Sequence, residues 1–117
     1  MVAVRDNGEA VVVEVHGEFA EKSLDEFNGV MASLLQNGRV QIVINLKRAQ
    51  WASLKALKWL VEHVHRARDR NGDMKLAGLN PHLSNMLELT GTHSLFDVYG
   101  NVEDAVNSFR LVSTPTR

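Results

Sequence analysis

Residues 40–46 (VQIVINL) form a nearly unbroken apolar run in the middle of the chain. Such a run is typical of a central parallel strand covered on both faces, since a solvated face would place a polar residue at every second position. The flanking segments can supply that cover. Residues 23–36 and 53–70 each repeat apolar side chains at helical spacing, and an Asn-Gly pair follows each of them. The run and its flanks therefore predict an α/β domain.

The rest of the chain continues the alternation of strands and helices. Asn7-Gly8 is a typical pair for a tight hairpin turn, so the first two strands are expected to be antiparallel. Ser23 and Glu26 are spaced as a capping box for the first helix. Asn80 and Asn101 are typical N-cap residues, and Pro81 suits the first position of a helix, so two further helices are expected to begin at these points. The other predicted strands cover residues 2–5, 10–16, 73–79 and 95–99.

This order predicts one α/β domain over residues 1–112. We expect a mostly parallel central sheet with right-handed crossovers, an antiparallel N-terminal edge hairpin and four helices. Residues 113–117 are predicted to be a flexible C-terminal tail. A chain of 117 residues with 44% hydrophobic and 23% charged residues has the composition of a single globular domain.

Composition also favours an intracellular protein. There is no cysteine, which excludes disulfides and thiolate chemistry and fits a reducing compartment. No apolar run approaches the roughly 20 residues of a membrane helix, and the N-terminus does not resemble a signal peptide. We therefore expect a cytoplasmic protein that does not insert into a membrane.

Motifs for catalysis or for a cofactor are not found. The chain has no phosphate-binding glycine loop and no nucleophile elbow. His63 and His65 lie two residues apart on a predicted helix, so they cannot hold one metal ion together and are expected to be solvated. We predict a protein that is not an enzyme and that has no metal and no cofactor.

Charge is distributed unevenly along the chain. Residues 47–75 have a net charge of +5, whereas residues 1–46 have −4 and residues 76–117 have −2. The overall net charge of −1 and the pI of about 6.5 do not fit a nucleic-acid-binding domain, which is usually strongly basic. The positive middle segment instead favours an acidic protein surface as partner.

The second helix contains a tryptophan opposite its apolar stripe. Trp59 shares a predicted face with Lys55 and Arg66. Its ring either packs on one of their side chains or under a loop, or it is an anchor for a partner, because exposed tryptophan among cations is typical of binding hot spots. Leu54 is expected to pack at the edge of the core, and Trp51, just before the helix, is expected to be buried. The stripe consists of Leu57, Leu60, Val61 and Val64.

Together these segments resemble the STAS domain, the fold of anti-sigma factor antagonists. The resemblance extends over about residues 2–110. The residues that carry it are Ile42-Val43-Ile44-Asn45-Leu46, Leu57, Leu60, Arg66-Ala67-Arg68, Asn71-Gly72, Leu79-Asn80-Pro81, Leu87-Glu88-Leu89-Thr90-Gly91, Leu95-Phe96, Tyr99 and Glu103-Asp104-Ala105.

The chain departs from the family at its phosphorylation motif. Family members usually end the central strand with Asp-Leu and open the next helix with Asp-Ser-(Ser/Ala)-Gly-Leu, in which the serine accepts phosphate. Here the strand ends Asn45-Leu46, and a gapless alignment puts Ser53 on the aspartate and Leu54 on the acceptor serine. Leu54 cannot accept a phosphate, so the usual switch is expected to be missing. Ser53 is a good helix cap and is the alternative phosphorylation site.

The resemblance implies a protein-binding module for an anti-sigma factor or a related histidine-kinase-like regulator, with release of a bacterial sigma factor as the outcome. Two alternatives remain open: a STAS subunit of a stressosome-like scaffold or of a lipid or anion transporter complex, and a sensor of a nucleotide or another small ligand. Homo-oligomerisation is also left open. The residues expected to bind the partner are Lys47, Arg48, Ser53, Leu54, Lys55, Lys58 and Trp59.

Overall fold

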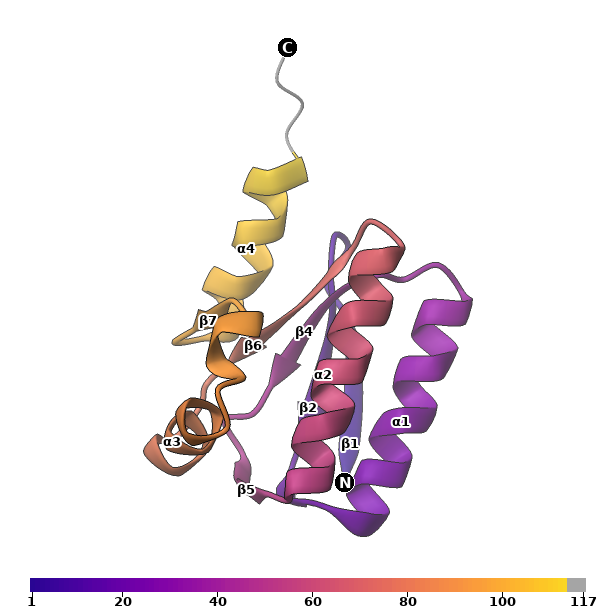
Figure 1. Ribbon diagram of the computed structural model, residues 1–117. Coiled ribbons are helices and arrows are strands. Elements are labelled where there is room, and N and C mark those ends of the chain that lie inside the picture. The colour runs from indigo at the N-terminus through magenta and orange to yellow at the C-terminus, as the bar shows by residue number, and fades with distance from the viewer. Residues whose placement is uncertain (114–117) are drawn as a thin grey trace.

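The computed structural model describes residues 1–113, and its centre is a five-stranded sheet with the strand order β1-β2-β4-β6-β7 (Figure 1). All neighbouring strands are parallel except β1 and β2, which form an antiparallel hairpin. The predicted α/β class, the mostly parallel sheet and the edge hairpin are thus confirmed. The strands are β1 (Val2–Asp6), β2 (Val11–Val15), β4 (Gln41–Asn45), β6 (Asp73–Ala77) and β7 (Val98–Tyr99).

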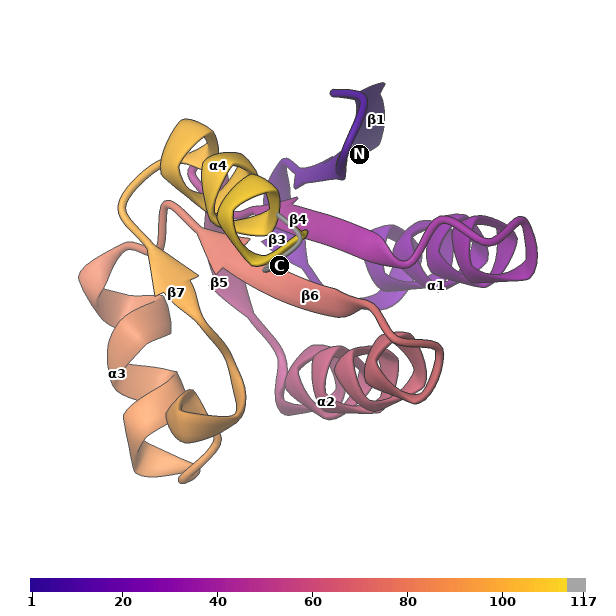
Figure 2. The ribbon, with the colours of Figure 1, turned by 90° about the horizontal axis from the view of Figure 1, so that it is seen from above.

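Within residues 1–113 four helices surround this sheet, as predicted. Figure 2 shows α1 and α2 side by side on one face of the sheet and α4 on the other. Asn80 accepts a hydrogen bond from the Leu83 amide, which confirms the predicted cap of α3. The helices are α1 (Glu21–Gln36), α2 (Leu54–Asp69), α3 (Pro81–Leu89) and α4 (Val102–Ser113), with one 3-10 turn, η1 (His93–Leu95).

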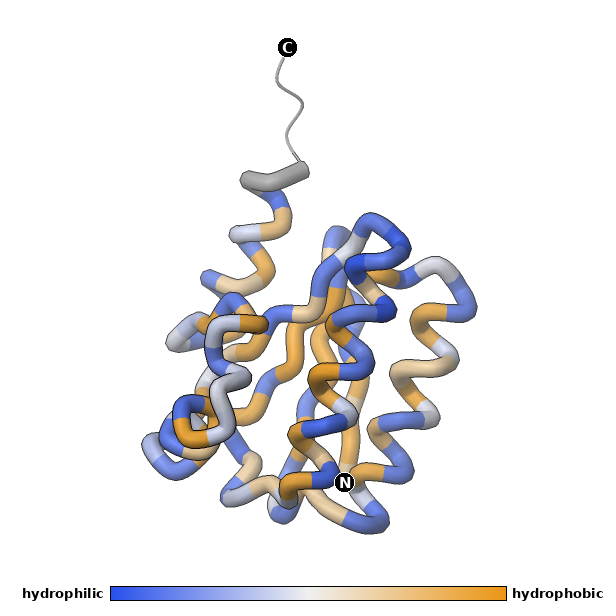
Figure 3. Tube along the Cα trace, viewed as in Figure 1, coloured by the Kyte–Doolittle hydropathy of each residue, from blue (hydrophilic) through white to orange (hydrophobic). Residues whose placement is uncertain are grey.

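The sheet separates two apolar clusters. Val11, Val13 and Val15 of β2 point into the larger cluster, which α1, α2 and α3 cover. Val12 and Val43 point the other way, into a smaller cluster under α4. Figure 3 shows that apolar positions recur from turn to turn along α1 and α2, and the buried ones belong to the larger cluster. Both faces of β2 and β4 are therefore buried, as the apolar run at 40–46 predicts.

The smaller cluster contains a buried cation. Lys75 lies on β6 and is almost completely buried. Its ammonium group donates a 2.7 Å hydrogen bond to Ser108 Oγ and lies 4.3 Å from the centroid of the Phe109 ring. A hydrogen bond and an aromatic face together compensate for part of the hydration that the ammonium group loses.

Two further strands were not expected from the sequence. Strands β3 (Gly17–Phe19) and β5 (Ala49–Ala52) pair in parallel and form a separate two-stranded sheet. Each has only three or four residues, too few for a clear alternation of polar and apolar positions. This small sheet leads into α1 on one side and into α2 on the other, so it fixes where both helices begin.

The predicted capping box at Ser23 is wrong. Helix α1 begins at Glu21, and Ala20 is its N-cap. Ser23 lies in the first turn, where its Oγ accepts a hydrogen bond from the Ala20 amide and donates one to the Glu18 carbonyl. The side chain therefore ties α1 to the end of β3 instead of capping a helix that starts three residues later.

At the other end of the chain, Ser113 is the last residue of α4, and residues 114–117 of the predicted flexible tail lie outside the described residues. Within residues 1–113, no helix has both the length and the apolar character needed to cross a membrane.

Candidate functional site

The start of α2 is fixed by a side-chain cap. Ser53 has an extended backbone, and its Oγ accepts a 3.0 Å hydrogen bond from the Ala56 amide. This satisfies one of the free N–H groups of the first turn. The structure thus confirms that Ser53 caps this helix, the role that the usual aspartate would have there.

Leu54 is the first residue of α2 and is 64% exposed. The expectation that it packs at the edge of the core is wrong, because its side chain projects to solvent from the first turn. Lys55 and Lys58 are exposed on the same stretch of helix. Together with Trp59 and Glu62 they line a shallow depression of about 250 Å³. Three of the predicted binding residues, Lys55, Lys58 and Trp59, therefore line the same depression.

Trp59 is half-buried and packs against the larger apolar cluster. Its ring stacks on the His63 ring, with centroids 5.5 Å apart and planes inclined by 30°. The Arg66 guanidinium carbon lies 5.9 Å from the Trp59 centroid. Of the alternatives that the sequence left open for Trp59, the structure therefore shows packing of the ring against a cationic side chain, that of Arg66. A role of Trp59 in binding a partner stays a prediction.

His63 is buried, with 1% of its surface exposed, so the expectation of a solvated histidine is wrong. Its Nε2 lies 2.8 Å from Asn28 Oδ1 on α1, and its ring meets the edge of Phe27. Burial, and to a lesser extent the nearby positive charge of Arg66, together lower the pKa of His63 to about 4. Ala56 and Ala67, also buried, flank this side of α2.

The sequence does contain a signal for the burial of His63. His63 lies three residues after Leu60 and four before Ala67, which is core spacing on a helix. Buried alanines beside it mark where α1 approaches α2. A histidine on such a face packs between the helices. Its Nε2 has a partner in Asn28, whereas its Nδ1 is buried without a hydrogen-bond partner among residues 1–113.

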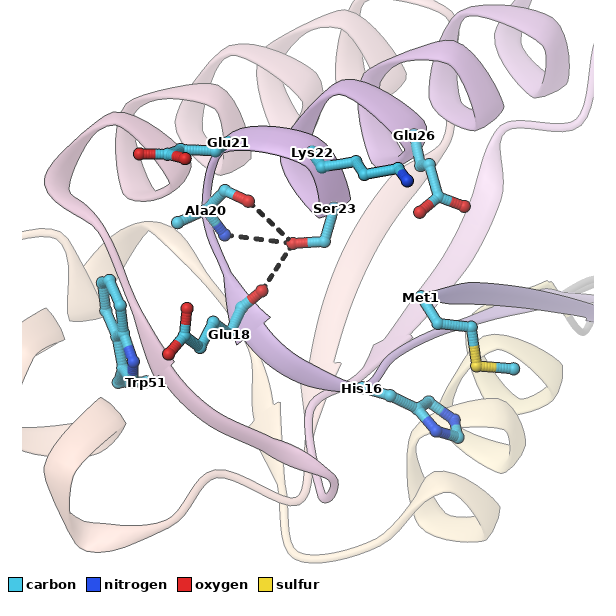
Figure 4. A pocket seen from close by; sticks show the side chains of 9 residues that line it. All are labelled: Met1, His16, Glu18, Ala20, Glu21, Lys22, Ser23, Glu26 and Trp51. Atoms are coloured by element: carbon cyan, nitrogen blue, oxygen red, sulfur yellow. Dashed lines mark hydrogen bonds between the residues drawn. The ribbon is translucent and has the colours of Figure 1, made fainter.

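Trp51 is 38% exposed, which overturns the expectation that it is buried. It lies on β5, opposite Glu18 of β3. It also borders a depression of about 420 Å³ whose other side is the first turn of α1. Figure 4 shows the indole beside the Glu18 side chain, with Glu21 on the turn above. Sequence reasoning missed this depression, because it depends on the two short strands. The residues that line it are Met1, His16, Glu18, Ala20, Glu21, Lys22, Ser23, Glu26 and Trp51.

Lys47 and Arg48 form the turn between β4 and β5, and both side chains are exposed. The Lys47 amide donates to Asn45 Oδ1, and the Arg48 carbonyl accepts a 2.8 Å hydrogen bond from the Gly17 amide. Whether these two cations form one patch with Lys55 and Lys58 stays a prediction.

Asn45 stands where the family usually has aspartate. The contacts of its side chain explain why an amide is favoured over a carboxylate at this position. Its Nδ2 donates a 2.8 Å hydrogen bond to Glu14 Oε2, while its Oδ1 accepts from the Lys47 amide. The second Glu14 oxygen is 2.5 Å from His16 Nε2. An aspartate at position 45 would put a second carboxylate against Glu14, which repels it. The amide, which both donates and accepts, fits this place.

Metal binding finds no support in the described part of the chain. Within residues 1–113 no group of three or more histidine, aspartate or glutamate side chains is arranged to hold a metal ion. The features that stand out at the start of α2 are exposed apolar and charged side chains, which suit contact with another macromolecule.

Comparison with known proteins agrees with this geometry. The family profile described as "Mlab, STAS domain" matches residues 2–97. An anti-sigma F factor antagonist of Paenibacillus polymyxa is 22% identical over 104 residues, which cover 88% of this chain and 89% of that protein. The crystal structure of an anti-sigma factor antagonist from Mycobacterium paratuberculosis superposes with a TM-score of 0.84 at 21% identity, over 94% of this chain and 93% of that one. A sulfate transporter family protein from Wolinella succinogenes superposes with a TM-score of 0.79 at 18% identity, over 92% and 90% of the two chains.

Proposed function

This chain belongs to the STAS domain family, and we propose that it is an anti-sigma factor antagonist that binds an anti-sigma factor, or a related histidine-kinase-like regulator, in the bacterial cytoplasm. Binding would occupy the regulator and release its sigma factor. The anti-sigma factor antagonists among its relatives and structural neighbours support this assignment. It acts as a binding module and catalyses no reaction.

One observation carries the assignment of the site. Leu54 is an exposed apolar side chain at the first position of α2, where the family places its phospho-acceptor serine, and exposed lysines follow it. Single exposed leucines are ordinary on a protein surface, so the support comes from the coincidence of Leu54 with the position of the family's phospho-acceptor and with the exposed Lys55 and Lys58.

The same residue removes the usual switch. A phosphoserine at this position would add about −1.5 to −2 charges beside the partner, whereas Leu54 stays uncharged under all conditions. We propose that binding is constitutive, or that it is controlled at another level such as expression. Ser53 is the alternative acceptor, but its Oγ already caps α2.

Titration calorimetry with purified anti-sigma factors from the genome that encodes this chain tests the function. We expect one of them to bind, and Leu54→Asp to weaken binding by about tenfold or more, because a carboxylate would be buried without a partner. Leu89→Asp is the matched control, since Leu89 is also an exposed leucine on a helix, and it should bind as the wild type does. Failure of every such factor to bind would contradict the proposed function.

A second assay addresses the switch. Incubation of the chain with the bound regulator and ATP should leave it without stoichiometric phosphate in mass spectrometry. Phosphate on Ser53 would show that the switch has moved by one residue and has not been lost.

A STAS subunit of a lipid or anion transporter complex is the second candidate. The likeness to a sulfate transporter family protein supports it. A transport ATPase or permease that co-purifies with the chain in place of an anti-sigma factor would favour this candidate over the first.

A further inference from the structure

We infer that the partner is held by two exposed apolar side chains, Trp51 and Leu54, and that it meets an acidic border next to Trp51 and a basic border next to Leu54. This inference rests on the proposed function in one respect, namely that the start of α2 binds a protein. It goes further because it adds Trp51 and a set of carboxylates to the surface and states the charges that the partner must present.

Trp51 is exposed because of the short strand on which it lies. In β5 the outer residues Ala49 and Ala52 are buried, whereas Gln50 and Trp51 face outward. Leu54 follows three residues later, so the two Cα atoms are at most about 11 Å apart. Two exposed large apolar residues whose backbones are this close are within reach of one partner surface, and such residues are typical of the centre of an interface.

The acidic border is built from β3 and from the first turns of α1. Glu18 is paired in register with Trp51 across the small sheet. Glu21 and Glu26 line the same depression, and none of these three carboxylates forms an ion pair among residues 1–113. Lys22 is the one lysine in the lining, so negative charge prevails there. An indole beside free carboxylates is a favourable site for a lysine or arginine side chain.

The basic border follows Leu54 along α2. Lys55 and Lys58 are both exposed, and neither forms an ion pair within the described residues. Residues three apart on a helix lie on neighbouring positions of its surface, so the two ammonium groups can act on one acidic patch of a partner.

This order of charges defines the partner. A protein surface fits when it has an apolar recess with a cation on one side and carboxylates on the other. Nucleic acid and anionic lipid fit poorly, because Glu18, Glu21 and Glu26 would repel their phosphates. Opposite charges at the two borders also fix the orientation in which the partner docks, since a reversed orientation would bring like charges together.

The experiment uses a phage library that displays protein fragments cloned from the genome encoding this chain, selected on the immobilised full-length wild type. We expect fragments that bind through both borders, with affinity about 30-fold lower for Trp51→Ala and about tenfold lower for Leu54→Ala. The double variants Glu18→Lys with Glu21→Lys, and Lys55→Glu with Lys58→Glu, should each bind at least about tenfold more weakly.

Controls separate binding from folding. Leu89→Ala is the matched control for Leu54→Ala, and Glu88→Lys, on an exposed site of α3, is the control for the acidic border. Both should bind as the wild type does. Thermal unfolding is measured for every variant, and if Trp51→Ala does not fold, Trp51→Phe and the charge reversals still test the inference.

The decisive step is a compensating reversal. A lysine or arginine of the selected fragment, changed to glutamate, should restore binding to the Glu18→Lys and Glu21→Lys variant. If fragments bind equally well to all variants, or if no fragment is selected, the inference is overturned. If the fragments depend on both borders but come from proteins other than anti-sigma factors or related kinases, the inference holds and the proposed function fails.

Discussion

The start and the middle of α2 each lie beside a tryptophan, but the surroundings of the two rings differ. Trp51 lies on β5, just before the helix, in a short two-stranded sheet that leaves its indole 38% exposed. Trp59, in the second turn, stacks on His63, which in turn contacts Asn28 and Phe27 of α1. The first ring faces a depression in the surface, and the second helps to seal the junction of two helices.

The difference shows that the neighbouring element, and not the residue type, decides what an aromatic side chain does. α1 runs beside α2 and covers its middle (Figure 2), so a ring there gains packing partners within the chain. At the start of α2 the chain comes from a short strand, and a ring there can gain comparable contacts only from another molecule. Replacement of Trp59 should therefore reduce stability more than binding, and replacement of Trp51 should reduce binding more than stability.

Trp59→Ala is expected to have the largest effect on stability. Loss of the ring removes the stack on His63 and part of the cover of the larger apolar cluster, so we expect about 3 kcal/mol of destabilisation, the lower end of the range for buried aromatic residues. Urea denaturation measures it. Trp51→Ala, the matched variant, should cost less than about 1 kcal/mol. Equal losses at the two positions, or a Trp59→Ala protein that is stable but cannot bind the partner, would contradict this division.

How far the sequence predicts this division depends on element length. Two segments with a strong pattern, the unbroken apolar run at 40–46 and the helical stripe of α2, were predicted correctly, because several positions in each carry the same signal. β3 and β5 have too few residues for a pattern, so Trp51 was wrongly expected to be buried. His63 was missed for another reason. Its spacing from Leu60 and Ala67 does indicate burial, but its polar partner, Asn28, lies 35 residues away, and no local pattern identifies it.

The candidate site shows the same limit. The cap at Ser53 and the exposed lysines at the start of α2 could be predicted from the local sequence, and the structure has both there. Glu18 and Trp51 become neighbours only because two short strands pair in parallel. Such a pairing brings together residues far apart in the chain, and single-sequence reasoning has no signal for it.

Acid should weaken the middle of α2. The pKa of His63 is about 4 in the folded chain, against 6.5 for an unperturbed histidine, because its neutral form is buried. Between these values the unfolded chain binds a proton that the folded chain does not, so stability falls as the pH drops from 6.5 to 4. We expect a loss on the order of 2 kcal/mol over this interval.

The free energy of unfolding from urea titrations at several pH values measures this effect. His63→Gln is the comparison, because glutamine can still donate to Asn28 but does not titrate. The difference between the two profiles isolates His63 from the other histidines and from the carboxylates. Parallel profiles below pH 6.5 would contradict the depressed pKa.

Ser53 should matter moderately for stability at the start of α2. Ser53→Ala removes the hydrogen bond to the Ala56 amide and should cost about 1 kcal/mol, the typical value for a lost N-cap. Ser53→Asp should stay close to the wild type, since aspartate caps well and its charge suits a helix N-terminus. Thermal unfolding compares the three proteins. If Ser53→Asp is stable but no longer binds the partner, Ser53 is the regulatory position after all.

The smallest effect on equilibrium stability, and the most specific for the start of α2, concerns Lys55 and Lys58. If they steer an acidic partner, the reversal of both to glutamate should slow association several-fold at low salt and change dissociation less, because rim charges act mainly on the encounter. At 0.01 M salt the Debye length is about 30 Å, and at 0.15 M it is about 8 Å, so the difference in association rate should shrink as salt rises.

Arg5→Glu is the control, on the exposed part of β1 and outside the predicted positive segment. Stopped-flow association across a salt series gives the answer. If the double variant associates at the wild-type rate at every salt concentration, these lysines only solvate the helix, and partner recognition rests on Trp51 and Leu54 alone.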